Sequence, residues 1–402
     1  MARTLLLLGG SAAQVCAIER AKELGYRTVL CDYLADNPGQ YTSDRFYQVS
    51  TTDREGVLDV ARAERVDGVV AYSSDPAAPT AAYVADALGL PGVPLSTAEA
   101  FCRKHLFRDF LERNGFNVPR TVTVVLGESI PDDAFALEFP VIVKPSDSSG
   151  SKGVTVVRAP EGLPIALEKA REFSRNGIAV VEEFIERDHP HVIEAEVFAV
   201  GGVVASWGLM NSIRDEESNP LLPAGYTIPL DLPLERAHLV RSEVSRLVSA
   251  SGVDCGAFNI EMVIDRNERL FFLDAGPRNG GNMLPEFISM ASGKDLVAAT
   301  IRAAMGDADA SDVSFDGIPD DYWGLGVLHS SRGGTFSGVA YSDAARSALV
   351  REHLQVVPGD TVRPFVRCND LVGLSFFKFS SKGEMDAVML DMDASMGVEV
   401  FG

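Results

Sequence analysis

The chain begins with a regular alternation of short apolar runs and amphipathic stretches. Apolar runs bounded by glycine or polar residues predict buried strands, and apolar residues at helical spacing predict the helices between them. The predicted strands cover residues 4–8, 28–32 and 66–72, and the predicted helices cover about 13–24, 54–64 and 77–88. Strands that alternate with helices in this way predict a parallel α/β sheet over residues 1–95.

Two polar turns follow predicted strands of this sheet. Gly9, Gly10 and Ser11 follow the first strand, and the segment 73–75 follows the third. In Rossmann-like sheets, which this pattern predicts, small molecules bind at the carboxyl ends of the strands. The first turn lacks the complete GxGxxG pattern, which weakens the alternative of a nicotinamide-dependent enzyme.

A long amphipathic stretch follows this first region. Its periodicity predicts one helix that begins at residue 96 or 97 and ends at Gly115. Arg103, Lys104 and Arg108 lie on the predicted polar side of that helix. The opposite side is an apolar stripe made of Ala98, Phe101, Cys102, Leu106, Phe110 and Leu111.

From residue 119 onward the pattern changes to strands with a few helices. The predicted strands cover residues 121–125, 141–143, 154–157, 179–181, 193–200 and 203–206, and the predicted helices about 162–175, 233–251 and 294–305. Residues 306–321 are rich in Asp, Ser, Gly and Pro, which is typical of a linker. The sequence thus predicts a mixed α/β and α+β protein with three domains, at 1–95, 96–310 and 311–402, the last a small C-terminal α+β subdomain.

The most informative segment is a predicted hairpin within residues 258–282. Two apolar runs flank a polar turn, and Glu261 and Asp274 each interrupt one run. A four-residue loop over 266–269 places these two carboxylates opposite each other. The other face then contains Ile260, Met262, Ile264, Phe271 and Leu273. Facing carboxylates repel unless a cation lies between them, and Mg²⁺ binds carboxylate and phosphate oxygens together. The alternative is a half-buried hairpin with one solvated face.

Two further segments carry groups that suit a nucleotide. An apolar strand ends in Lys144, and the Ser/Gly-rich turn 146–153 follows it with backbone N–H groups that can surround phosphate oxygens. It is not a P-loop, because GxxxxGK[ST] is absent. Another apolar strand ends in a segment whose backbone can contact adenine, made of Glu182, Glu183, Phe184 and Ile185. Taken alone, the first segment is typical of a flexible hairpin tip and the second of a buried strand end.

The order of these segments resembles the ATP-grasp superfamily. After an N-terminal α/β domain come a helix with Lys104, a strand ending in Lys144, a Ser/Gly loop, the Glu-Glu-Phe-Ile strand end, and a paired-carboxylate hairpin followed by Arg278. The resemblance covers residues 1–310 and leaves a C-terminal lid. It implies an ATP-grasp fold with ATP and Mg²⁺ as cofactors.

The resemblance also implies a role for each matching residue. Lys104 and Lys144 match lysines that contact ATP phosphates, and Arg278 matches the arginine that steadies the transferred phosphoryl group or the acyl phosphate. Glu261 and Asp274 match the acids that bridge two Mg²⁺ ions, for which Mn²⁺ is an alternative. The implied ATP contacts further include Ser148, Ser149, Gly150, Ser151 and Gly153 of the loop and Glu182, Glu183, Phe184 and Ile185 of the adenine segment.

Three positions depart from the family pattern or leave it open. The ribose-binding acid is Glu194, with Glu186 and Glu196 as competitors. Asp274 is shorter than the usual Glu. Gly276 stands where the family has an Asn ligand, so that Asn279 or Asn282 are the alternative donors. Some amino-acid ligases of the superfamily also lack this Asn, which favours that branch.

The function implied is an ADP-forming carboxylate–amine ligase, in which an acyl phosphate is attacked by an amine, such as that of an amino acid. The acceptor enters near Arg278 and a predicted long loop from residue 210 to 229, where Arg214 is a candidate to hold a carboxylate. His189, His191 and His329 are candidates for substrate contact, against a packing role. The alternatives are phosphorylation of bicarbonate or another acid without a peptide-type product, and a non-catalytic ATP-binding regulator.

Charge and cysteine content limit the classes of partner that the protein is expected to bind. The formal net charge is −21 over 402 residues, which argues against nucleic acid or an anionic membrane as a partner. The five cysteines form no CxxC pair, which suggests a reducing cytoplasm without structural zinc. Neither a signal peptide nor an apolar run of membrane-spanning length is expected. The predicted partners are small-molecule carboxylates and amines, with a homodimer as the assembly considered.

Overall fold

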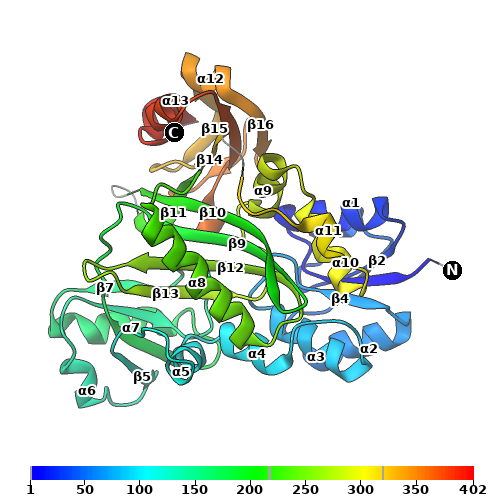
Figure 1. The fold of residues 1–402 in the computed structure, drawn as a ribbon, viewed down its shortest axis with the longest axis horizontal. Coiled ribbons are helices and arrows are strands. Elements are labelled where there is room, and N and C mark those ends of the chain that lie inside the picture. The colour runs from blue at the N-terminus through cyan, green and yellow to red at the C-terminus, as the bar shows by residue number, and fades with distance from the viewer. Residues whose placement is uncertain (1, 216–218, 319–320) are drawn as a thin grey trace.

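The computed structural model describes residues 2–215, 219–318 and 321–402. Figure 1 shows three lobes around a central twisted sheet: an N-terminal lobe in blue and cyan, a second lobe in blue-green, and a C-terminal lobe in orange and red. The mixed α/β and α+β class predicted from the sequence is confirmed. Among the described residues, no helix has the length and apolar character needed to cross a membrane.

The N-terminal lobe is the predicted parallel sheet, with strand order β3-β2-β1-β4. Its strands are β1 (Thr4–Leu8), β2 (Arg27–Asp32), β3 (Arg45–Gln48) and β4 (Gly68–Val70), and its helices are η1 (Ala12–Gln14), α1 (Val15–Glu23), η2 (Pro38–Tyr41), α2 (Arg54–Glu64) and α3 (Ala78–Leu88). The sequence prediction omitted β3, which is short and at most half-buried. A distant helix, α10 (Leu296–Ala304), packs Val297 and Ile301 against Leu5 and Leu7 of β1, so the lobe is completed by a later segment.

The predicted single helix over 96–115 is wrong. The chain forms α4 (Leu95–Phe101) and α5 (Lys104–Arg113), separated by an extended residue, Arg103 (φ −131°, ψ 109°). The break makes Lys104 the first residue of α5, and its N–H donates to the carbonyl of Ser146 at 2.8 Å. Arg108, expected on a polar face, is buried instead.

The second lobe is an antiparallel sheet with order β5-β8-β6-β7. Its elements are β5 (Thr121–Val125), α6 (Asp132–Phe135), β6 (Val141–Pro145), β7 (Thr155–Val157), η3 (Pro160–Gly162), α7 (Leu163–Arg171) and β8 (Ile178–Glu183). Apolar residues of α7 pack on the sheet, which buries its core. Lys144 and Glu182 lie on the adjacent strands β6 and β8, so their side chains can meet.

The central sheet has eight strands in the order β13-β12-β9-β10-β11-β14-β18-β16. These are β9 (Val192–Val200), β10 (Val203–Asp215), β11 (Asn219–Ile228), β12 (Cys255–Ile264), β13 (Leu270–Gly276), β14 (Tyr322–Leu328), β16 (Leu349–Leu354) and β18 (Gly373–Phe379). The long loop predicted over 210–229 is wrong, because β10 and β11 form a long antiparallel hairpin there. Residues 216–218 of that segment lie outside the described residues. One face of the sheet packs against α8 (Leu234–Ser251), α4 and α5.

The C-terminal segment contributes both to the central sheet and to a lobe of its own. Strands β14, β16 and β18 extend the central sheet, and β15 (Gly334–Tyr341), β17 (Thr361–Val362) and β19 (Met396–Phe401) form a small sheet with order β17-β15-β19. Its helices are α12 (Asp343–Ala348), η4 (Cys368–Asp370), α13 (Lys382–Met389) and α14 (Met392–Ser395). Upstream lie α9 (Leu284–Ser292), absent from the prediction, and α11 (Ala310–Val313), which lies inside the predicted linker.

Candidate functional site

A pocket lies between the second lobe and the edge of the central sheet formed by β13. The space between its walls is about 1050 Å³ when the open mouth is included. The predicted site residues that line it are Lys104, Lys144, Ser148, Ser149, Gly150, Ser151, Glu182, Glu183, Phe184, Ile185, Glu261 and Asp274. Residues from distant parts of the sequence thus meet around one space.

A buried ion-pair network forms one wall of this pocket. Glu182 accepts from Lys144 Nζ at 2.8 Å and from Arg108 Nε at 2.6 Å. Arg108 also donates to the carbonyls of Phe272 (3.2 Å) and Leu273 (2.9 Å), which satisfies backbone groups on the edge strand β13. Burial alone would raise the pKa of Glu182, but Arg108 and Lys144 outweigh burial and lower the pKa to about 2. Burial lowers the pKa of Lys144, against the opposing charge of Glu182.

This network makes the stability of the protein sensitive to acid. An unfolded Glu titrates near ~4.3, above the folded pKa of about 2, so the ionised carboxylate stabilises the fold by about 3 kcal/mol. That contribution is complete above about pH 5 and is lost as the pH falls towards 2. We expect Glu182→Gln to lower the free energy of unfolding at pH 7 by about 3 kcal/mol, with the deficit shrinking as the pH falls. Denaturant unfolding at several pH values measures it, and a pH-independent deficit would contradict the assignment.

Lys104 reaches the pocket from the start of α5. Its Nζ donates to the carbonyl of Ser148 at 2.8 Å and lies 3.4 Å from Asp274 Oδ2. The helix break at Arg103 is what aims this side chain at the loop and the hairpin together. Lys104 and Lys144 both line this pocket.

The Ser/Gly loop 146–153 lies folded over the pocket. Gly150 (φ +64°), Ser151 (φ +55°) and Gly153 (φ +75°) adopt left-handed backbone conformations, which point successive N–H groups in unusual directions. Ser151 Oγ donates to the carbonyl of Leu221 on β11 at 2.8 Å, which ties the loop to the central sheet. Gly153 does not line the pocket; a Cβ there would lie 2.8 Å from Pro145, so its role is to close the turn.

The adenine segment continues β8 along the pocket wall. Glu183 N–H donates to the carbonyl of Arg120, and Phe184 N–H donates to the carbonyl of Pro140, both at 3.0 Å. These two N–H groups are already used within the protein, so the predicted adenine contacts from the backbone of Glu183 and Ile185 would have to use other groups of the segment. The side chain of Ile185 packs beside Val192, Val263 and Phe271 and gives this end of the pocket an apolar surface.

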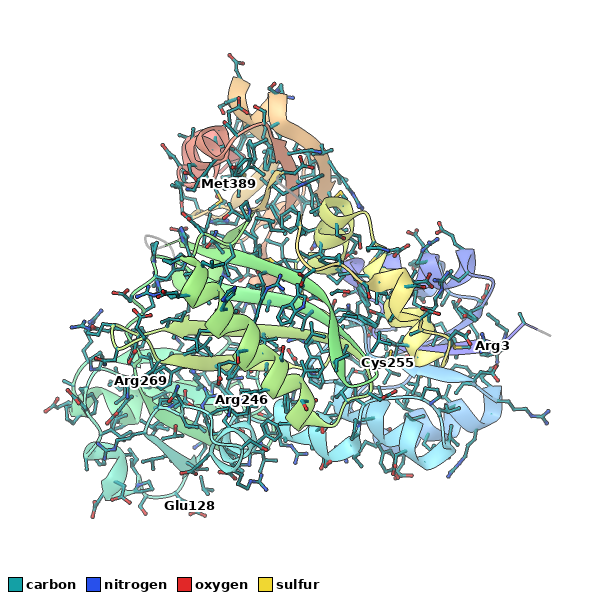
Figure 2. The ribbon with its side chains drawn as sticks, viewed as in Figure 1. Arg3, Glu128, Arg246, Cys255, Arg269 and Met389 are labelled. Carbon is teal, nitrogen blue, oxygen red and sulfur yellow. The ribbon has the colours of Figure 1, made fainter. Side chains whose placement is uncertain are left out.

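The hairpin formed by β12 and β13 pairs Glu261 directly with Asp274, as predicted. Arg269, labelled in Figure 2, marks its turn. The predicted apolar face is wrong in part. The loop has five residues, and a bulge between Glu261 and Met262 restores the register. In consequence Phe271 and Leu273 lie on the pocket side with Val263, whereas the core face contains Ile260, Met262, Ile264, Leu270, Phe272 and Ala275.

Each of the two facing acids lies beside a cation. Asp274 lies beside Lys104, and Glu261 Oε1 lies 3.3 Å from Nη2 of Arg214, a buried residue of β10. Two facing carboxylates that line the same pocket as Lys104 and Lys144 form a donor set that fits Mg²⁺, a cation that binds carboxylate and phosphate oxygens. Within the described ranges, no three His, Cys, Asp or Glu side chains converge on one cation position.

None of the three proposed ribose acids lines this pocket, among the residues that the structure describes. Glu186 is exposed and bonds to Arg266, and Glu196 is held by the N–H of Gly280 at 2.9 Å. Glu194 pairs across the sheet with Glu261 and so faces a second cavity instead. The expected contact of Glu194 with ribose thus stays a prediction, for a residue that lines the second cavity and not the first.

The second cavity adjoins the first and shares Glu261 and Asp274 with it. Its other polar lining includes Asp75, Lys152, Glu194, Arg214, Tyr226, Asn259, Arg278 and Asn282. Glu194 Oε1 accepts from Asn259 Nδ2 at 2.6 Å, but its buried Oε2 has no partner. Burial, reinforced by Glu261, raises the pKa of Glu194 well above the ordinary value, while burial raises the pKa of Glu196 to about 8.

Arg278 lies in this second cavity, held between the N-terminal lobe and the central sheet. Its Nε donates to Asp75 Oδ1 at 2.6 Å, and its Nη1 donates to Asn259 Oδ1 at 3.0 Å. Burial acts to lower the pKa of Arg278. The carboxylate of Asp75 stabilises the charged guanidinium more strongly, so the pKa is raised above its ordinary value. Of the alternative metal donors, Asn282 lines the cavity and bonds Tyr226, whereas Asn279 is buried against Glu196.

Sequence reasoning missed three residues of this site: Arg108, Asn259 and Asp75. Asp75 had a signal, because the segment 73–75 follows a strand of the first sheet. Asn259 also had one, since it stands two positions before Glu261 and so on the same face. Two of the three candidate histidines have partners within the protein, as in the packing role given as their alternative: His189 hydrogen-bonds Asn211, and His329 lies 3.2 Å from Asp215.

Some known proteins resemble this chain in sequence, and others resemble it in fold. The family described as the ATP-binding domain of the carbamoyl-phosphate synthase L chain matches residues 104–309. Formate-dependent phosphoribosylglycinamide formyltransferase of a Synechococcus species is 33% identical over 191 residues, 46% of this chain and 49% of that protein. The carbamoyl phosphate synthase large chain of Corynebacterium glutamicum is 28% identical over 310 residues, 75% of this chain and 27% of that protein. The chain thus spans about half or less of the length of these relatives.

A solved structure matches the chain over its whole length. L-amino acid ligase from Bacillus licheniformis superposes with a TM-score of 0.81 at 21% identity, and the match covers 100% of this chain and 99% of that one. At this identity the likeness establishes a common fold, including the lobes on both sides of the central sheet.

Proposed function

Because the chain belongs to the family of the carbamoyl-phosphate synthase L chain ATP-binding domain, a branch of the ATP-grasp superfamily, we propose that it is an ATP-dependent carboxylate–amine ligase. The resemblance noted in the sequence is confirmed at the level of family and fold. The proposed reaction joins a carboxylate to an amine and releases ADP and phosphate. The proposed substrates are small molecules, such as amino acids.

One observation carries this proposal: two lysines, a Ser/Gly loop and two facing acids surround a single pocket. Lys104, Lys144 and the loop N–H groups supply the positive field that phosphoryl transfer requires. Glu261 and Asp274 would hold Mg²⁺, which neutralises phosphate charge when bound. The apolar end beside Ile185 suits an adenine ring.

The proposed chemistry needs little acid–base work from side chains. A substrate carboxylate oxygen attacks the γ-phosphorus, the bond from that phosphorus to the β–γ bridging oxygen breaks, and ADP leaves. The amine nitrogen then attacks the acyl carbon, the carbon–oxygen bond to phosphate breaks, and the nitrogen loses a proton. The loop 146–153, tied to β11 through Ser151, would exclude water from the acyl phosphate between these steps.

We place the carboxylate and the amine in the second cavity, next to Glu261 and Asp274. The unpartnered Oε2 of Glu194 is a buried polar atom that a hydrogen-bonding group of the amine substrate can satisfy. We expect Glu194→Gln to raise the KM for the amine by about 10-fold or more, with the KM for ATP little changed. Glu196→Gln is the matched control on the same strand face, because Glu196 is satisfied within the protein. Equal amine KM values for wild type and Glu194→Gln would remove Glu194 from the amine site.

Phosphorylation of a small acid such as bicarbonate is the second candidate. It is favoured by the match over 75% of this chain to proteins named for the synthesis of carbamoyl phosphate. A non-catalytic ATP-binding regulator is less favoured, because both lysines and both acids are present in one pocket.

A substrate panel tests the proposed function. Purified protein is incubated with Mg-ATP and pairwise mixtures of amino acids, other small carboxylates and bicarbonate, and nucleotide products are separated by chromatography. We expect ADP and phosphate in equal amounts, and only with the right pair. Release of AMP and pyrophosphate would contradict the acyl-phosphate mechanism, and ADP release with bicarbonate alone would favour the second candidate.

A further inference from the structure

Arg278 is held by an acid from a different lobe. Asp75 follows β4 of the N-terminal sheet, 203 positions before Arg278, and its Oδ1 lies 2.6 Å from both Nε and Nη2 of the guanidinium. A second tie joins the same segments, since Ser73 Oγ donates to the carbonyl of Gly280 at 2.7 Å. The N-terminal lobe, drawn in blue and cyan in Figure 1, therefore contributes a side chain to the cavity beside the central sheet.

The remaining contacts of Arg278 leave it little freedom. Nη1 donates to Asn259 Oδ1 and to the carbonyl of Asn279, each at 3.0 Å. A guanidinium has five N–H groups, so one N–H of Nη2 is left for a ligand. The side chain is only 14% exposed, and that of Asp75 is 25% exposed. A planar cation fixed in this way keeps its direction before any anion arrives.

Gly276 supplies the space for this pair. A Cβ at position 276 would lie 2.9 Å from Arg278 Cζ and Nε and 2.9 Å from Asp75 Oδ1. Any side chain there would have to displace the ion pair. The residue that replaces the usual Asn ligand is therefore explained by packing: the Arg278–Asp75 pair occupies the place where that side chain would lie.

We infer that Asp75 is a positioning residue, which fixes Arg278 so that its free N–H and its charge face the phosphoryl group being transferred. This inference rests on the proposed function for the identity of the anion. In place of an amide ligand at position 276, the N-terminal lobe orients a cation towards the same anion. Asp75 acts only through Arg278, so its contribution disappears when Arg278 cannot reach it.

The test uses inorganic phosphate as a probe of the full-length protein saturated with MgADP. Phosphate affinity is measured by titration calorimetry for wild type, Asp75→Asn, Arg278→Lys and the double variant. Lysine keeps the charge but cannot bond Asp75 and Asn259 together. Asp67→Asn is the matched control: Asp67 precedes β4 at its other end and bonds Thr4 N–H at 2.8 Å.

We expect Asp75→Asn and Arg278→Lys each to weaken phosphate binding by about 10-fold or more, and the double variant to be no weaker than Arg278→Lys alone. MgADP affinity and the effect of Asp67→Asn should remain within about twofold of wild type. Wild-type phosphate affinity in Asp75→Asn, additive losses in the double variant, or no phosphate binding by wild type would each overturn the inference. Failure of the proposed function gives a different result: no ADP is released in the substrate panel, while the phosphate affinities of the single and double variants still follow the expected pattern.

Discussion

Replacing Lys144 with methionine lowers the rate of ADP formation by about 100- to 1,000-fold while the protein stays folded. Lys144 is the penultimate residue of β6; it lines the pocket and is only 8% exposed. Its ammonium is a buried positive charge at the place where we propose that the phosphates lie, between the loop and β8. Methionine keeps an unbranched apolar stem but lacks the terminal ammonium and its charge. The rate of ADP release with the substrate pair found in the panel measures the effect.

The fold of this variant is protected by Arg108. Glu182 keeps its hydrogen bonds to Arg108 Nε and Nη2 when Lys144 is lost, so the carboxylate does not become an unpaired buried charge. Lys169→Met, on the exposed side of α7 in the same lobe, is the matched control and should keep the wild-type rate. Near-wild-type turnover in Lys144→Met, with a thermal transition like that of wild type, would remove Lys144 from the phosphate site.

Replacing Glu261 with glutamine is the second change with a large expected effect. Glu261 is the central member of the Glu194–Glu261–Asp274 row across β9, β12 and β13, and it lines both cavities. An amide oxygen in place of the carboxylate removes one negative charge from the metal ligands. We expect the affinity for Mn²⁺, in the presence of ADP, to fall by about 100-fold, together with turnover. Electron paramagnetic resonance of free Mn²⁺ measures the affinity without any need for turnover.

The control for Glu261 lies on the same hairpin. Glu268 is in the turn between β12 and β13, where it pairs with Arg236 on the surface, so Glu268→Gln should leave Mn²⁺ affinity unchanged. Unchanged Mn²⁺ affinity in Glu261→Gln would show that the facing acids serve the hairpin and not a metal. Arg214 would then be the natural counter-ion of Glu261 in all states of the protein.

The pairing of Glu261 with Asp274 could be predicted because a strand alternates its faces with a period of two residues. The side on which Phe271 and Leu273 lie could not. The loop is one residue longer than predicted, which shifts the pairing of the residues next to the turn by one position. The bulge then adds one residue on β13, so the pairing of Glu261 with Asp274 is again the predicted one. Both features are set by tertiary contacts, such as the bonds from Arg108 to the carbonyls of Phe272 and Leu273.

The partners of the charged residues were the least predictable part of the site. Arg108 looked solvent-facing because the periodicity of residues 96–115 indicates one helix, whereas the break at Arg103 rotates α5 relative to α4. Asp75 and Arg278 are 203 positions apart, and no local pattern connects them. By contrast, Lys104, Lys144 and the loop were found from their order along the chain, which the fold family preserves.

The transfer of oxygen from substrate to phosphate tests the central claim most directly. The carboxylate identified in the panel is labelled with ¹⁸O, and the phosphate released during turnover is examined by mass spectrometry. The account predicts one ¹⁸O atom in each phosphate, because a carboxylate oxygen attacks the γ-phosphorus and leaves with it. Phosphate without label, with amide formed and ADP released, would contradict an acyl-phosphate ligase at this site.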